Sequence, residues 1–157
     1  MSLKIASRTY YSFSEYKGNV NSIDSIDGDG IVIPEGFVSI GSIYRSAGMI
    51  IPDTVISIGE IYYSSLIIPA SVESISKIKG SGDRGNDEIK VTISLKSKIP
   101  PMIGSIVDLS RFDSLMVPQG ALNAYKNHPI WGKFKNISEN PRLNSLTPST
   151  TGTTTSS

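Results

Sequence analysis

The sequence predicts a mainly β solenoid made of short coils of 17–18 residues and closed by a small helix-containing cap at its C-terminal end. One observation is a repeat: Lys17, Pro34, Pro52 and Pro69 hold the same place in four copies of one pattern, at spacings of 17, 18 and 17 residues. The other is that the apolar residues at fixed offsets are mostly isoleucine and valine, which favour strands. Such a period indicates coils that bury their apolar faces against each other.

Three columns of the repeat keep one residue type in all four copies, and a fourth is apolar throughout. The constant columns are Ser22, Ser39, Ser57 and Ser74; Ile23, Ile40, Ile58 and Ile75; and Ile26, Ile43, Ile61 and Ile78; the apolar column is Val20, Phe37, Val55 and Val72. We expect the isoleucine columns to form buried ladders along the solenoid axis, with coils about 4.8 Å apart. The serine column predicts an internal hydroxyl ladder or a turn device.

Each coil is expected to hold two short parallel strands, because 17 residues leave little room for a helix of ordinary length beside them. One strand falls on the "IIP" segment and the other on the "VxSI" segment. Alternation along the first of these strands turns one set of apolar residues toward the core. The set is Ile31 and Ile33, Met49 and Ile51, and Leu66 and Ile68.

The chain divides into four segments. Residues 1–16 predict N-terminal strands, and residues 17–98 the repeat solenoid, with a glycine-rich charged loop at 79–88 before the strand-like run "IKVTISLKS". Residues 99–138 predict the last coil and the cap, with a short helix over 121–127 and aromatic anchors at Trp131 and Phe134. Residues 139–157 are rich in serine and threonine, and we expect an extended arm that is disordered alone and anchors the solenoid to an assembly partner.

The composition argues against several classes of function. The 15 basic and 14 acidic side chains nearly cancel and form no basic block, so we expect no nucleic-acid partner. The chain has no cysteine, and therefore no disulfide or thiolate metal site. Its first residues lack the apolar core of a signal peptide, and no stretch reaches the roughly 20 apolar residues of a membrane span, so we expect no membrane insertion.

Two glycine-rich segments match ligand-binding motifs only in part. Residues 80–85 fit the GxGxxG pattern, but a strand-like run follows where a nucleotide site needs a helix, so we expect a flexible loop. Asp24, Asp27 and Asp29 lie close together in "DSIDGDG" but lack the spacing of a calcium loop, so we expect a tight turn between coils.

Single residues give no catalytic constellation. His128 is the only histidine and has no nucleophile near it in the sequence, which favours a surface or packing role. Trp131 is expected to belong to the cap core rather than to a sugar or partner site. Asn136 begins a glycosylation sequon that has meaning only in a eukaryotic secreted chain. We therefore expect no catalytic residue, cofactor or metal.

Alternation also leaves one apolar row that faces outward. This outer row consists of Val32, Ile50, Ile67 and Met116, with Tyr44, Tyr62 and Tyr63 near the coil corners and Val38 and Ile56 as a further extension. An outward apolar row of this length marks a contact surface. Two occupants stay open here: a protein partner, or a terminal segment of the same chain.

Several segments resemble the BspA-like leucine-rich-repeat family. "IPDTVISIGEI" and "IPASVESI" are similar to its repeat, and "IPPMIG" followed by "LMVPQGALNAYKNHPIWGKFKNI" is similar to its closing segment, so the likeness covers about residues 31–137. The resemblance implies a right-handed solenoid of leucine-rich-repeat type that binds other proteins, commonly on bacterial surfaces. The repeats here are shorter, cut to "YRSAG" or "YYSS" where the family continues, and no export signal is visible.

The expected function is a non-catalytic module for protein–protein interaction or structure. The favoured form is a component or decoration docked on a larger assembly such as a virion, which accounts for a repeat fold without an export signal. Its partners are then assembly neighbours, self-association included, and its location is the surface of that assembly. The alternative is a fragment of a bacterial cell-surface adhesin, and an enzyme is the third and least favoured hypothesis.

Overall fold

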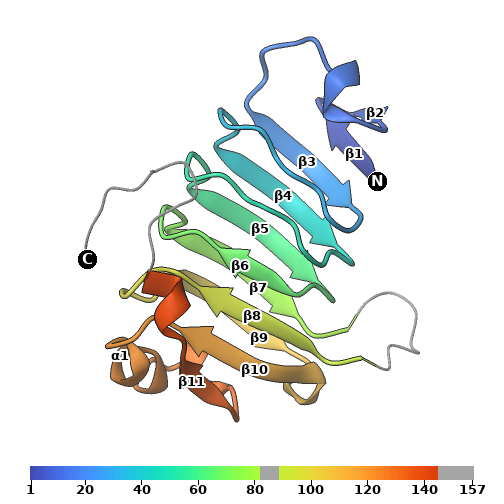
Figure 1. Ribbon diagram of the computed structural model, residues 1–157. Coiled ribbons are helices and arrows are strands. Elements are labelled where there is room, and N and C mark those ends of the chain that lie inside the picture. Colours follow the sequence, from blue (N-terminus) through green and yellow to red (C-terminus); the bar gives the residue numbers. More distant parts are fainter. Residues whose placement is uncertain (82–88, 145–157) are drawn as a thin grey trace.

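The computed structural model describes residues 1–81 and 89–144 and confirms the predicted β-solenoid with a small helix near its C-terminal end (Figure 1). Two sheets run along one axis. The first sheet is seven-stranded, in the order β2-β1-β3-β4-β5-β7-β9. Its strands are β1 (Ser2–Ile5), β2 (Arg8–Tyr10), β3 (Ser22–Asp27), β4 (Ser39–Tyr44), β5 (Ser57–Tyr62), β7 (Ser74–Lys79) and β9 (Met102–Val107).

The second sheet is four-stranded, in the order β11-β10-β8-β6. Its strands are β6 (Leu66–Ile68), β8 (Val91–Leu95), β10 (Phe112–Val117) and β11 (Ile137–Glu139). The helical segments are η1 (Phe13–Glu15), η2 (Leu109–Arg111), α1 (Leu122–Lys126), η3 (Trp131–Lys133) and η4 (Pro141–Asn144). None of the helices in the described ranges is long and apolar enough to cross a membrane.

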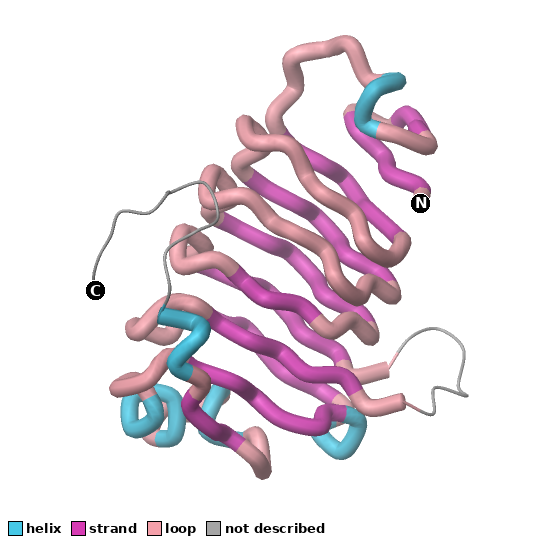
Figure 2. The backbone as a smooth tube through the Cα atoms, in the orientation of Figure 1, coloured by secondary structure: helices cyan, strands magenta, loops and turns pink. Residues whose placement is uncertain are grey.

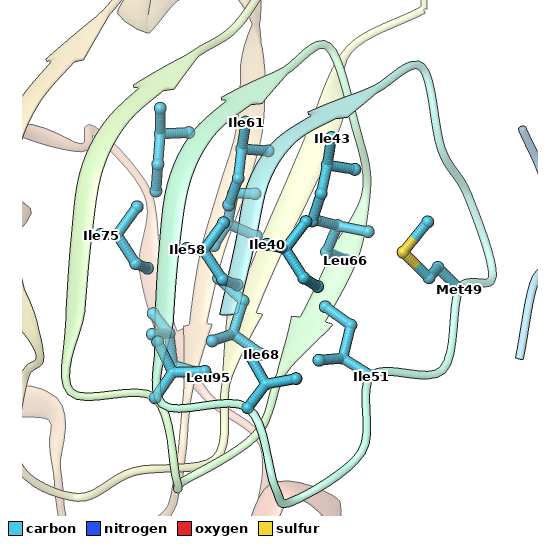
Figure 3. Packing of buried hydrophobic residues seen from close by; sticks show 14 of the residues in the cluster. Ile40, Ile43, Met49, Ile51, Ile58, Ile61, Leu66, Ile68, Ile75 and Leu95 are labelled. Atoms are coloured by element: carbon cyan, nitrogen blue, oxygen red, sulfur yellow. The ribbon is translucent and has the colours of Figure 1, made fainter. Parts of the chain in front are cut away.

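The isoleucine columns are buried ladders, as the repeat predicts. In the parallel register of the first sheet, Ile40 stands between Ile23 and Ile58, and Ile75 follows Ile58. Figure 3 shows Ile40, Ile58 and Ile75 in a row inside the solenoid, together with Ile51, Ile68 and Leu95 from the opposite side. A parallel sheet stacks identical residues directly, so identical shapes repeat at the spacing of neighbouring strands.

The ladders continue one coil further than the sequence pattern indicates. In β9, Ile103 pairs with Ile75, and Ile106 pairs with Ile78, so β9 is a fifth copy of the motif. Methionine replaces the column serine there, since Met102 pairs with Ser74. The long insertion after β7 and this replacement together hide the fifth copy in the sequence.

Each ladder strand bends in its middle. Its two buried isoleucines are three residues apart, as in Ile58 and Ile61, whereas a straight strand places residues two apart on one face. Gly59 lies at the bend of β5, and a Cβ atom built on it would stand 2.3 Å from the carbonyl oxygen of Gly41. At Gly59, and likewise at Gly41 and Gly104, the neighbouring backbones are closer than a side chain allows, whereas β3 and β7 carry Asp24 and Ser76 at this place.

We expect the substitution Gly59→Ala to lower the free energy of unfolding by about 1–3 kcal/mol, because the added methyl group forces two backbones apart. Urea unfolding followed by circular dichroism measures this loss. Ser57→Ala, a substitution in the half-buried serine column of the same strand, is the control and should change stability by less than about 0.5 kcal/mol. Equal stability of the two variants would show that the close approach relaxes without cost.

The second predicted strand of each coil forms only in part. Residues 31–33 and 49–51 meet through a single bridge between Val32 and Ile50, and a regular strand begins only at β6. Gly48, the extra residue of the 18-residue coil, takes a left-handed φ of 70° directly after the bridge between Ala47 and Ser65, where pairing with the next coil stops. Figure 2 shows residues 31–33 and 49–51 as loop beside the strands of the second sheet.

The internal hydroxyls lie at a different column from the one predicted. The serines that begin β3, β4, β5 and β7 are half-buried at the edge of the ladder, whereas Ser46 and Ser64 at the coil corner are buried. The Ser46 backbone N–H donates to Ser64 Oγ at 3.0 Å, and each hydroxyl donates to a carbonyl two residues earlier. Left-handed residues Arg45 and Tyr63 precede this pair and turn the chain between the sheets.

Both ends of the solenoid are covered. At the N-terminal end β1 pairs antiparallel with β3, and Val20 is exposed rather than buried with its column, because the described chain has no earlier coil to cover it. At the C-terminal end α1 lies within the helix predicted over 121–127, and Trp131 and Phe134 are buried. The folded part extends past residue 138, since β11 includes Glu139 and Leu143 is buried. The rest of the expected arm, 145–157, lies outside the described residues.

Candidate functional site

Three residues of the outer row are exposed on one face. The side chains of Val32, Ile50 and Ile67 are 60%, 53% and 53% exposed, while their neighbours in sequence, Met49, Ile51, Leu66 and Ile68, are buried. This alternation is what the sequence predicts for strands with one face in the core. Water therefore contacts large aliphatic side chains on three successive coils, an arrangement that favours a contact surface.

The row continues differently beyond Ile67. In the register of the second sheet, Ile67 stands beside Ser94, and Ser94 beside Met116, so a serine interrupts the apolar row. Met116 is less exposed than the other residues of the row because β11 lies beside it and covers part of its side chain. The Ser138 hydroxyl of β11 donates to the Met116 sulfur at 3.1 Å. The exposed apolar part of the row is thus Val32, Ile50 and Ile67.

A groove of about 340 Å³ opens between Ile50 and Ile67. Its walls and floor are Gly48, Met49, Ile50, Ser65, Leu66, Ile67, Thr92 and Ser94. Within the described ranges, no backbone hydrogen bond joins residues 49–51 to residues 66–68, although Ala47 and Ser65 still form a bridge. Gly48 therefore splits the second side of the solenoid and leaves an uncharged, mainly aliphatic slot in the middle of the outer row. The single 18-residue spacing in the repeat is the one signal in the sequence that could have indicated this slot.

The tyrosines lie near the coil corners, as predicted, on the side of the first sheet. Tyr44 and Tyr62 end strands of the first sheet, where their rings stack at 5.0 Å with an angle of 5° between them, and the Tyr62 hydroxyl donates to Glu60. Tyr63 forms the corner and packs against the core. The corner that contains Ser64 separates these rings from Ile67 along the chain.

The predicted extension of the row through Val38 and Ile56 also belongs to the first sheet. The N–H of Ile56 donates to the Val38 carbonyl at 2.9 Å, immediately before β4 and β5 begin. Ile56 is exposed and Val38 half-buried. The proline turns of the coils, which include Pro34 and Pro52, lie along the chain between these two residues and the outer row. Val38 and Ile56 are therefore not part of the site.

The aspartates and the histidine considered as possible ligands accept hydrogen bonds from backbone N–H groups in turns. The Asp24 carboxylate accepts the Ser7 N–H at 2.8 Å, and the Asp29 carboxylate accepts the Ala47 N–H at 3.0 Å. His128 Nδ1 accepts the backbone N–H groups of Ile130 and Trp131, which fixes the start of η3. The glycine-rich motif at 80–85 lies mostly outside the described residues.

The cap holds two buried aromatic side chains that each donate a hydrogen bond. Trp131 Nε1 donates to the Pro101 carbonyl at 2.9 Å, and the Tyr125 hydroxyl donates to the Ser97 carbonyl at 2.8 Å. Burial raises the pKa of Tyr125, so its hydroxyl remains a donor in alkaline solution as well as at neutral pH. Both groups tie the cap to the segment between β8 and β9. The Asn136 amide donates to the Asp113 carbonyl at 3.1 Å.

Comparisons with known proteins assign no family to this chain. No protein-family model matches it, no curated protein matches it, and no solved structure matches it. The resemblance to BspA-like repeats therefore stays a prediction from the residues. The site that the structure offers is the slot between Ile50 and Ile67, with Val32 beside it.

Proposed function

We propose that this protein is a non-catalytic interaction module that docks on other protein surfaces through the exposed part of its outer row. The observation that carries the proposal is the uncharged slot between Ile50 and Ile67, flanked by two side chains that are each 53% exposed. Contact with a protein surface would remove these side chains from water, at about 25 cal/mol for each Å² of apolar area buried. An aliphatic side chain of a partner fits such a slot as an anchor residue.

The larger setting that we propose is a multi-protein assembly such as a virion, on which the solenoid is a structural component or decoration. A stack of coils with covered ends supports this role, because it presents the side chains of successive coils in one row along its axis. The BspA-like resemblance supports a cell-surface adhesin of leucine-rich-repeat type as the second candidate. Both candidates use the same face, and they differ in the partner.

We expect the double substitution Ile50→Lys/Ile67→Lys to leave the fold intact and to abolish binding, because two ammonium groups in the slot lose hydration on contact. The measurement is mass spectrometry of what each variant retains from an extract of its native source, compared with the unaltered protein. Ile99→Lys/Met102→Lys is the matched control, since it adds the same charges at exposed apolar residues off the row. Retention of the same proteins by the row variant would rule out this face as the interface.

A further inference from the structure

We infer that the occupant of this face is a second copy of the chain, packed face to face about a two-fold axis that runs parallel to the strands between Ile50 and Ile67. The inference rests on the proposed function, which identifies the face but not its partner. It follows from the order in which apolar and charged residues succeed each other along the solenoid axis.

Over the four coils from residues 31–33 to β8, the face is uncharged in its middle and carries opposite charges toward its two ends; Asp113 of β10 lies one coil beyond them. Glu35 and Asp53 are exposed at the corners that follow the outward residues of the first two coils, Val32 and Ile50. Two coils further along, Lys96 and Lys98 follow Ser94 at the same corner. Among the described residues, these four side chains have no ion pair with each other.

The same order of charge appears at the opposite corner. Asp29 is exposed just before the first coil's outward segment, and Lys90 is exposed just before β8. Arg45 is a basic residue in the acidic half, at the turn that joins β4 to residues 49–51. The face is thus acidic along most of its N-terminal half and basic at β8.

A half-turn about the proposed axis reverses the order of the coils and keeps the direction of the strands. It places Ile50 opposite the second copy's Ile67 on each side of the axis, and the two slots face each other at the centre of the contact. It also places Glu35 opposite Lys96 and Lys98 of the other copy, twice in each dimer, because the contact is isologous. No charge lies at the centre, where an unpaired charge would be costly.

The contact area sets the expected strength. Four coils at about 4.8 Å and strand segments of a few residues cover a few hundred Å² on each copy, which is less than the roughly 800 Å² per partner of a stable complex. We therefore expect a weak monomer–dimer equilibrium, in which the average molecular mass in solution rises with protein concentration. The charged rim of the contact makes association weaker when salt is raised, because exposed ion pairs are screened.

Two variants with reversed charges test this arrangement, and sedimentation velocity measures the self-association of each variant and of their mixture. Glu35→Lys alone and Lys96→Glu/Lys98→Glu alone should each weaken self-association on the order of tenfold, because like charges then face each other twice. An equimolar mixture of the two variants should associate as the unaltered protein does, since every pair across the heterodimer is again attractive. Neither variant alters the slot.

The control pair carries the same changes of charge on the first sheet, away from the face: Glu73→Lys and Lys4→Glu/Arg8→Glu, all at exposed residues. These variants should self-associate normally and gain nothing on mixing, which separates a specific contact from attraction between oppositely charged chains. A chain that stays monomeric at every concentration would overturn the inference, as would a mixture no stronger than its components. The proposed function is tested separately by the retention experiment: it is contradicted if the variant Ile50→Lys/Ile67→Lys still retains the same proteins from the extract.

Discussion

Replacing Ile58 with alanine is expected to lower the free energy of unfolding by about 3–4 kcal/mol, within the usual range for isoleucine truncated in a core. Ile58 is 2% exposed and stands in β5 between Ile40 and Ile75, so the cavity opens in the middle of the ladder. Neighbouring isoleucines are held by their own strands and cannot collapse into the space. The melting temperature should fall by about 10 °C.

The matched control is Ile56→Ala, two residues earlier in the chain. Ile56 is 48% exposed, so its truncation should change stability by less than about 0.5 kcal/mol. Circular dichroism reports the whole solenoid, and fluorescence of Trp131, the only tryptophan, reports the cap. Equal losses at Ile56 and Ile58 would contradict the assignment of inward and outward faces.

The isoleucine ladders were predictable because the residues that form them recur at fixed positions in the sequence repeat. When each repeat forms one coil, a parallel sheet places the same position of successive repeats side by side, so constant isoleucine at two positions already indicates the inner face. The exposure of Val32, Ile50 and Ile67 follows from the same alternation. Met116 has the same place in its strand, yet β11 returns beside it, and such a long-range contact leaves no mark on the local sequence.

Backbone conformation accounts for what the sequence did not predict. One inserted glycine at 48 separates residues 49–51 from β6 and opens the slot, whereas the repeat alone indicates a continuous strand ladder. The left-handed corner at Tyr63 turns its ring toward the core and away from the row. The buried hydroxyls are at Ser46 and Ser64 because the corner leaves N–H groups to satisfy there, as Ser64 does for Ser46.

The boundary of the C-terminal arm also depends on a few polar contacts. Composition alone predicts an arm from residue 139, because only one apolar residue lies between there and residue 145. That residue, Leu143, is buried, and Asn144 Oδ1 accepts the Gln119 N–H at 2.8 Å. The Asn140 N–H donates to the Val117 carbonyl at 2.8 Å and continues the pairing of β11 with β10. Residues 139–144 thus join the fold through strand pairing, one buried side chain and a side-chain hydrogen bond, none of which composition reveals.

Truncation of the cap is expected to have the other large effect. Trp131→Ala should lower the free energy of unfolding by about 3–5 kcal/mol, because it removes a fully buried ring and leaves the Pro101 carbonyl without its donor. The ring contacts Tyr125 edge-on at a centroid distance of 5.9 Å and stacks near Phe134 at 6.3 Å, so its loss loosens the whole aromatic cluster.

The location of this loss distinguishes a cap from an ordinary core residue. In a stack where each coil contacts only its neighbours, removing the cap should open the last coils first, so amide exchange should accelerate in β9 and β10 before it does in β4 and β5. Trp131→Phe is the control: it keeps most of the packing and loses the hydrogen bond, at a cost of about 1 kcal/mol. Uniform acceleration along the solenoid would show that the coils unfold as one unit and that Trp131 acts as part of a common core. Faster exchange confined to the C-terminal coils would establish the aromatic cluster as the lid on an otherwise open apolar end.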